Sequence, residues 1–165
     1  MPQLILIAHN LRSSHNVGSL LRTAEGLGLE RVCLTGYTPY PRASDDERLP
    51  HLSQKIDKQI AKTALGAEKL VSWQHYADIS QLIGKLKSDD YQIVALEQAV
   101  GSIKLFEYKP PRKLAIIVGR EVEGIESEVL EMCDKIIEIP MSGKKESFNV
   151  VQAAAMALYH MTFAL

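Results

Sequence analysis

Short apolar runs alternate with segments of helical periodicity along the whole chain, and this alternation limits the folds that the chain can adopt. The expected strands are residues 4–8, 31–35, 69–73, 93–96, 114–118 and 136–139. The expected helices are residues 17–27, 55–65, 79–86, 127–132 and 150–163. Such alternation is typical of a mostly parallel sheet with helices on both faces. We therefore predict an α/β fold, and the length of 165 residues suits a single domain over residues 1–165.

Charge and cysteine content narrow the class of protein. The formal net charge is −1, which is not the balance of a protein that binds nucleic acid through bulk positive charge. Cys33 and Cys133 each lie in an apolar run, as core thiols of a reducing compartment do. The first ten residues lack the basic stretch of a signal peptide, and the apolar segment 150–165 is too short to span a membrane. We therefore expect a cytoplasmic protein with no membrane partner.

Several common catalytic motifs are missing. The sequence has no GxGxxG and no GxxxxGK[ST], which disfavours the usual dinucleotide and P-loop sites. It has no GxSxG, and its five histidines show no HExxH or other paired ligand spacing. The expected chemistry therefore uses no metal.

Three polar constellations follow or precede the expected strands and helices, and the first lies near the N-terminus. Asn16 is placed to cap the helix that follows, and Gly18 allows close approach of another backbone. Arg22 is expected on the first or second turn, near a helix N-terminus that favours an anion. The alternative is a capped helix with a surface arginine.

The second constellation, residues 119–125 (GREVEGI), comes directly after the strongest expected strand. Ligands of parallel sheets bind beyond the carboxyl ends of strands. Gly119 and Gly124 let the backbone curl tightly, and Glu121 could accept hydrogen bonds from a ribose or hold a cation. A plain turn with solvated charges is the alternative.

The third constellation, residues 139–150, joins the last expected strand to the last helix. Ser147 and Asn149 can bond to backbone or to a ligand, and simple helix capping by Ser147 is the alternative. The helix that follows is apolar nearly all round, so it should be buried on all sides by sheet, loop or another subunit. The proline-rich segment 37–52 is the one candidate for a mobile functional loop.

Together, in this order, the three constellations closely resemble the motifs of the SpoU-TrmH group of RNA ribose methyltransferases, part of the SPOUT superfamily. The motif Asn-x-Gly-x-x-x-Arg-x-Ala is matched by Asn16, Gly18, Arg22 and Ala24. The motif Gly-x-Glu-x-x-Gly is matched by Gly119, Glu121 and Gly124. The motif Ile-Pro-Met followed by Ser-x-Asn-Val is matched by Ile139, Pro140, Met141, Ser147, Asn149 and Val150. Phe148 and Val151-Gln152 depart from the group's usual residues, as changes of packing.

The resemblance implies a trefoil knot in the C-terminal third, an exception to normal topology, with S-adenosylmethionine bent inside it. By position, the implied cofactor contacts are Leu96, Glu97, Val118, Gly119, Arg120, Glu121, Ile139, Pro140, Met141, Ser147, Phe148 and Asn149. The implied catalytic residues are Arg22, Asn16, Glu121, Ser147 and Asn149. Because a guanidinium has a pKa above ~12, Arg22 is easier to defend as a phosphate fork or an alkoxide stabiliser than as a free base.

The resemblance also implies a homodimer and an RNA partner. Basic residues in or beside the motif loops are the candidate RNA contacts: Arg12, Arg22, Arg42, Arg120, Lys144 and Lys145. We expect transfer RNA as the substrate, because the chain shows no separate RNA-binding extension and transfer RNA offers unstacked nucleotides. Three alternatives stay open: a ribosomal RNA 2′-O-methyltransferase, a catalytically silent RNA-binding module on the same fold, and an unrelated small-molecule enzyme with a parallel sheet.

Overall fold

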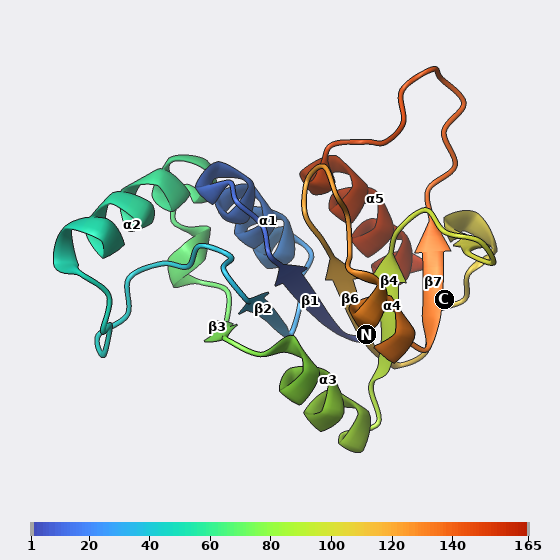
Figure 1. Ribbon diagram of the computed structural model, residues 1–165, viewed down its shortest axis with the longest axis horizontal. Coiled ribbons are helices and arrows are strands. Elements are labelled where there is room, and N and C mark those ends of the chain that lie inside the picture. The colour runs from blue at the N-terminus through green and yellow to red at the C-terminus, as the bar shows by residue number, and fades with distance from the viewer. Residues whose placement is uncertain (1, 165) are drawn as a thin grey trace.

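Seven strands form one sheet in the computed structural model, which describes residues 2–164 (Figure 1). They are β1 (Gln3–His9), β2 (Arg31–Thr35), β3 (Trp73–Tyr76), β4 (Gln92–Leu96), β5 (Ile103–Lys104), β6 (Lys113–Val118) and β7 (Lys135–Glu138). The order across the sheet is β3-β2-β1-β6-β4-β7-β5. Every neighbouring pair is parallel, which confirms the predicted parallel sheet.

Helices cover both faces of this sheet (Figure 1). One face carries α1 (Ser14–Gly26), α2 (Pro50–Ala64) and α5 (Val150–Phe163), and the other carries α3 (Ile79–Ser88) and α4 (Ser127–Met132). Side chains of successive residues of β1 point to opposite faces of the sheet: Leu4 and Leu6 pack in the hydrophobic core on the first face, and Ile5 and Ile7 pack in the core on the second. Burial of both faces explains why the central strands read as continuous apolar runs.

Some boundaries differ from the prediction. The expected strand at residues 69–73 is wrong, because residues 67–69 form a short 3-10 helix, η1 (Ala67–Lys69), and Leu70 is 74% exposed in the turn that follows. The strand begins only at Trp73 and has no fully buried residue, so its sequence lacks an apolar run. The two-residue strand β5 and the 3-10 helix η2 (Leu105–Glu107) gave no periodicity to detect.

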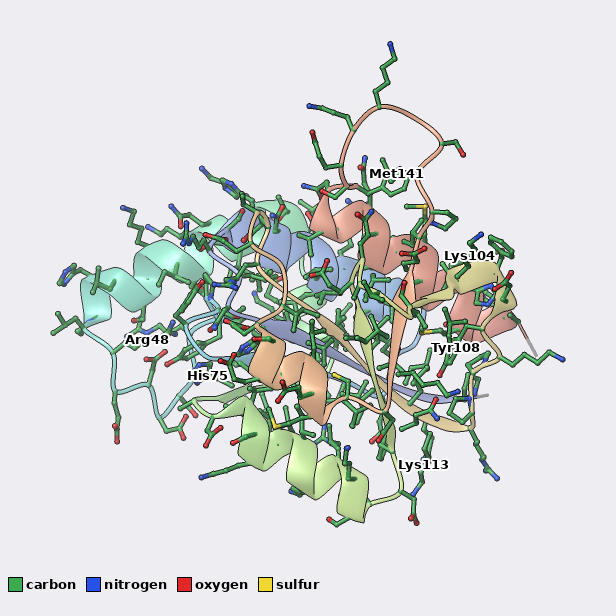
Figure 2. The ribbon with its side chains drawn as sticks, turned by 45° about the vertical axis from the view of Figure 1, so that its right-hand side comes forward. Arg48, His75, Lys104, Tyr108, Lys113 and Met141 are labelled. Atoms are coloured by element: carbon green, nitrogen blue, oxygen red, sulfur yellow. The ribbon has the colours of Figure 1, made fainter. Side chains whose placement is uncertain are left out.

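Side-chain contacts of Arg48 hold the proline-rich segment before α2 in place. Arg48 donates to the carbonyl oxygens of Tyr40 and Pro41 at 3.0 and 3.1 Å and forms a 2.6 Å ion pair with Asp46. Its guanidinium lies over the Tyr40 ring, which stacks on His75 of β3, and the labelled Arg48 and His75 mark this region in Figure 2. The helix itself starts at Pro50, inside the predicted loop, with proline in its first turn.

The sheet order places the last strand between two earlier ones. β7 pairs with β4 on one side and with β5 on the other, although both precede β6 in the chain. From β7 the chain makes a wide excursion before it returns as α5 beside the sheet (Figure 1). This arrangement agrees with the predicted knot, and the knot itself stays a prediction.

Candidate functional site

A cavity lies at the carboxyl ends of β4, β6 and β7 and is bordered by the start of α5. Parallel sheets bind ligands at such strand ends. The cavity is lined by Leu96, Glu97, Gln98, Val118, Gly119, Arg120, Glu121, Val122, Glu123, Gly124, Glu138, Ile139, Ser147, Phe148 and Val150. The second motif (residues 119–125) and the third motif (residues 139–150) therefore line the same cavity.

Both glycines of the second motif are required by close contacts. A Cβ on Gly119 would lie 2.5 Å from Ile125 Cγ1 and 2.9 Å from the carbonyl carbon of Gly124. Gly124 has φ +73°, and a Cβ there would strike the Glu97 carboxylate. Arg120 closes the loop, because its Nε donates to the Gly124 carbonyl oxygen at 2.9 Å. The curled backbone that the glycines predicted is confirmed.

Glu97 holds this loop from the end of β4. Its Oε2 accepts from the Ile125 N–H at 3.0 Å, and its Oε1 accepts from the Gln98 N–H at 2.9 Å. Both carboxylate oxygens are thus engaged by the backbone. Glu97 lines the cavity and fixes the shape of its wall.

Glu121 is the anion at the N-terminus of α1. Its Oε1 accepts from the Ser13 N–H at 3.2 Å, from the Arg12 N–H at 3.3 Å and from Asn16 Nδ2 at 3.4 Å. The free N–H groups of a helix start favour a carboxylate in this place. The predicted anion site is therefore filled by the protein itself, and the contact joins the first motif to the second.

The predicted cap of the first motif helix is wrong. Ser13, not Asn16, caps α1, because its side chain accepts from the Asn16 N–H. At α5 the alternative of capping by Ser147 does not hold, because Asn149 is the cap and its Oδ1 accepts from the Val151 N–H at 2.9 Å. The earlier start of α1 moves Arg22 to the third turn. Gly18 does allow close approach, since a Cβ there would collide with the Ile60 carbonyl oxygen of α2.

A polar network lies at the end of β1, beside the second motif. Glu126 Oε1 accepts from Asn10 Nδ2 at 2.9 Å and lies 3.7 Å from Arg120 Nε. Glu126 Oε2 is 3.1 Å from Nε2 of the buried His9, whose Nδ1 is 2.8 Å from Thr35 Oγ1. The motif search did not find this network; the adjacent polar residues His9 and Asn10 at the end of a buried strand were the available signal.

Burial and charge set the titration of this network. Burial, the largest effect, lowers the pKa of His9 below 6.5, against the opposing charge of Glu126 and in the same direction as the charge of Arg120. Burial alone would raise the pKa of Glu126, but the hydrogen bond from Asn10 and the charges of His9 and Arg120 contribute to a net lowering. The network thus holds a neutral imidazole beside an ionised carboxylate near neutral pH.

The remaining predicted site residues are spread more widely. Nine of the twelve expected cofactor residues line the cavity, whereas Pro140, Met141 and Asn149 are absent from its lining. Met141 belongs to the segment between β7 and α5 that projects from the body of the molecule, and Figure 2 labels it near the base of that segment. Arg22 is exposed on α1 and is also outside the cavity. Arg22 is therefore not part of the cavity wall that Ser147 helps to form.

The expected RNA contacts come from several places. Arg12 is exposed beside the second motif and pairs with Glu123 at 3.3 Å. Arg42 is exposed before α2, and Lys144 and Lys145 are exposed in the projecting segment. Arg120 is half-buried and committed to the loop of its own motif. Arg120 is thus held inside the protein loop, whereas Arg12, Arg42, Lys144 and Lys145 are exposed at the surface.

Comparison with known proteins identifies the family. The family model described as "SpoU rRNA Methylase family" matches residues 3–159, so the chain belongs to this family. It is 29% identical over 158 residues to the 23S rRNA (guanosine-2′-O-)-methyltransferase RlmB of Bordetella pertussis, covering 96% of this chain and 58% of that protein. It is 29% identical over 164 residues to the tRNA (guanosine(18)-2′-O)-methyltransferase of Borreliella burgdorferi, covering 98% of this chain and 67% of that protein.

Solved structures share the fold. The SpoU methyltransferase AviRb from Streptomyces viridochromogenes, in complex with the cofactor AdoMet, superposes with a TM-score of 0.79 at 19% identity, over 97% of this chain and 57% of AviRb. The chain therefore spans little more than half of AviRb and of the Bordetella relative. Among residues 2–164, no helix is long and apolar enough to cross a membrane, and no three His, Cys, Asp or Glu side chains are grouped to hold a metal ion.

Proposed function

We propose that the chain transfers a methyl group from S-adenosylmethionine to a ribose 2′-hydroxyl of RNA, with residues 1–165 acting as one methyltransferase domain. The observation that carries the proposal is the cavity at the carboxyl ends of β4, β6 and β7, lined by both the second and the third motif. Family membership and the two 2′-O-methyltransferase relatives support it.

The cavity residues fit the proposed cofactor. Leu96, Val118, Ile139 and Phe148 would supply apolar walls for a flat adenine ring, and Glu121, Glu123 and Glu138 would add carboxylates that suit a cationic ligand. When bound, S-adenosylmethionine supplies an activated methyl group on a sulfonium, so the proposed reaction calls for no metal. The backbone curl from Gly119 to Gly124 would hold the adenosine part of the cofactor, with Glu97 fixing that curl.

Protein groups then have to position the 2′-hydroxyl and stabilise the charge that develops on its oxygen. The planar fork of Arg22 suits an adjacent phosphate or the developing alkoxide. Glu121 holds the start of the helix that carries Arg22, through Ser13 and Asn16. Ser147 lines the cavity and would orient the nucleotide or the methyl donor, and Asn149, which caps the following helix, would hold the segment that carries Ser147. Well-placed reactants can contribute ~7–11 kcal/mol.

A homodimer completes the proposal. Arg22 lies outside the cavity in one chain, and α1 packs beside α5 (Figure 1). The outer face of α5 presents Met156, Tyr159 and Phe163 to solvent in the single chain. A second copy that covers these side chains would provide a route for an Arg22 to reach a nucleotide at a cavity.

The free thiols Cys33 and Cys133 agree with a cytoplasmic enzyme.

Transfer RNA is the favoured substrate of the proposed reaction. Exposed Arg12, Arg42, Lys144 and Lys145 can fix phosphates without reading sequence. Selection would then depend on shape and on an unstacked nucleotide. The RlmB relative acts on 23S rRNA, so ribosomal RNA is the second candidate.

The decisive experiment is tritium transfer from labelled S-adenosylmethionine to unmodified transfer RNA and to ribosomal RNA fragments in parallel, at one stated salt concentration. A 2′-O-methylated nucleoside in digested transfer RNA is the expected product. Transfer only to ribosomal fragments would reject the preference, and a methylated base would reject the ribose assignment. RNA binding without any transfer would favour the silent RNA-binding module.

Cofactor binding can be measured separately by calorimetry with excess chelator and no RNA. Heat of binding under these conditions is expected, because the cavity is formed by the protein alone. Binding that appears only when a divalent metal is restored would contradict the metal-free mechanism.

A further inference from the structure

Tyr37 is an exposed aromatic residue that the cavity does not use. It follows Gly36 directly after β2 and is 54% exposed. Its backbone is nevertheless fixed: its N–H donates to Asn10 Oδ1 at 3.1 Å, and the hydroxyl of the buried Thr38 donates to the Thr35 carbonyl oxygen at 2.8 Å. An exposed ring on a fixed backbone loses little freedom when it binds a ligand.

Two hydrogen bonds join the segment that carries Arg12 to the segment that carries Tyr37. The Tyr37 N–H donates to Asn10 Oδ1 at 3.1 Å, and the Leu11 N–H donates to Thr38 Oγ1 at 3.0 Å. The Tyr37 hydroxyl, followed by the charge of Glu123, raises the pKa of Arg12, in agreement with this placement. Arg12 also borders a shallow hollow with Ser13 and the segment 121–123. The same three residues, 121–123, line the cavity of the proposed methyl donor. Tyr37 and Arg12 therefore lie next to the cavity, and the segment 121–123 separates them from it.

The chemistry of this pair suits a nucleotide. An aromatic face accepts a nucleobase by stacking, and unpaired bases of RNA loops are the ones that proteins splay out and stack. A guanidinium beside the ring can take the neighbouring phosphate. The pair of Arg12 with Glu123 is exposed, so its exchange for a phosphate costs little. The charged neighbours make an apolar protein partner a poorer match.

Building on the proposed function, we infer that Tyr37 stacks on an unpaired nucleobase of the RNA substrate while Arg12 binds an adjacent phosphate. Tyr37 is then a positioning residue that selects single-stranded over paired RNA. It acts on RNA affinity and leaves the cofactor cavity unchanged, because neither Tyr37 nor Arg12 lines that cavity.

The test compares wild-type protein with Tyr37→Ala, Tyr37→Phe and Arg12→Ala by fluorescence anisotropy. The probes are a labelled RNA stem–loop with an unpaired loop and a fully paired RNA duplex. Tyr37→Ala should bind the stem–loop about 10-fold more weakly while its affinity for the duplex stays unchanged, and Tyr37→Phe should restore stem–loop binding. Arg12→Ala should reduce the salt dependence of binding by about one phosphate contact on both probes.

Leu70→Ala is the matched control, since Leu70 is an exposed side chain just before β3, at the opposite end of the strands. It should bind both probes as the wild type does. The inference is overturned if Tyr37→Ala binds the stem–loop like wild type, if both probes lose affinity equally, or if wild type binds neither. Methyl transfer is read on the same samples: a wild type that binds with the expected pattern but transfers nothing refutes the proposed reaction and leaves base stacking supported.

Discussion

Glu121 connects two segments that lie 105 residues apart in the sequence, through its contact with Asn16. A carboxylate at a helix N-terminus contributes about 0.3–1 kcal/mol at an exposed site. Its larger effect is geometric, because the loop that lines the cavity also holds the start of α1. A ligand that rearranges the loop at Glu121 would therefore shift the helix that carries Arg22.

Arg22→Ala should slow methyl transfer by about 10²–10³-fold and leave S-adenosylmethionine affinity nearly unchanged. Arg22 is exposed and outside the cavity, so cofactor contacts survive its loss. Loss of one charged contact to the developing alkoxide costs about 2.7–4 kcal/mol in the transition state. Single-turnover transfer and cofactor calorimetry measure the two effects, and Arg22→Lys, which keeps the charge without the planar fork, should recover only part of the rate. Near wild-type turnover of Arg22→Ala would show that the assignment is wrong.

Gly124→Ala should disrupt the cavity. Gly124 has φ +73°, where a side chain costs about 1–2 kcal/mol, and its Cβ would also strike Glu97. We expect lower stability in urea unfolding and a large loss of cofactor affinity. Gly143→Ala is the matched control, because a Cβ there meets nothing within 4 Å. Equal cofactor affinity of the two variants would contradict the role of the curl.

At the scale of elements, the sequence predicted those that local pattern determines. Residues 127–132 and 150–163 were predicted with the observed bounds, because their apolar spacing and flanking polar residues are local signals. Edge strands were predicted poorly: β3 lacks an apolar run, since its residues are only partly buried or exposed. The same holds for the candidate site. The loops at the strand ends were predicted from local motifs. The contacts of Glu121 and Glu126 were not predicted, because they join residues over a hundred positions apart and depend on the order of the strands in the sheet.

The start of α1 offers a test of one such boundary. Ser13→Ala should lower the free energy of unfolding by about 0.5–2 kcal/mol, because Ser13 caps the helix. Asn16→Ala should cost less, since Asn16 lies inside the first turn and only its side-chain contact with Glu121, at 3.4 Å, is lost. Urea unfolding of both variants measures the difference. A larger loss for Asn16→Ala would restore Asn16 as the cap.

At the scale of the whole molecule, stability should fall with acidification. Burial lowers the pKa of His9, so the unfolded chain, with an ordinary value of 6.5, binds more protons than the folded chain below that pH. The lowered pKa of Glu126 acts in the same direction below 4.5. The temperature of half-unfolding should therefore fall as the pH is lowered from about 7.5 to about 5.5. The His9→Gln variant should show a smaller dependence of this temperature on pH over the same interval. A midpoint that rises over the same interval would contradict the assignment.

The last prediction concerns assembly. The helix α5 is apolar nearly all round, and its buried side chains Ala157, Leu158 and Met161 face the core of its own chain. On the opposite side of the helix Tyr159 is 62% exposed and Phe163 is 61% exposed, with their ring centroids 4.8 Å apart and the rings tilted by 52°. Exposed aromatic side chains grouped on one helix mark an interaction surface. A second copy is the partner that the proposed reaction needs, because Arg22 lies outside the cavity of its own chain.

Light scattering at low micromolar concentration should therefore give about twice 18.4 kDa. Tyr159→Asp buries a charge in the proposed interface, so it should yield a folded monomer that binds S-adenosylmethionine but transfers no methyl group. Leu70→Asp, which adds the same charge at an exposed site before β3, should stay dimeric and active. A wild type that is monomeric with full activity would refute the dimer and would leave Arg22 to reach its substrate within one chain.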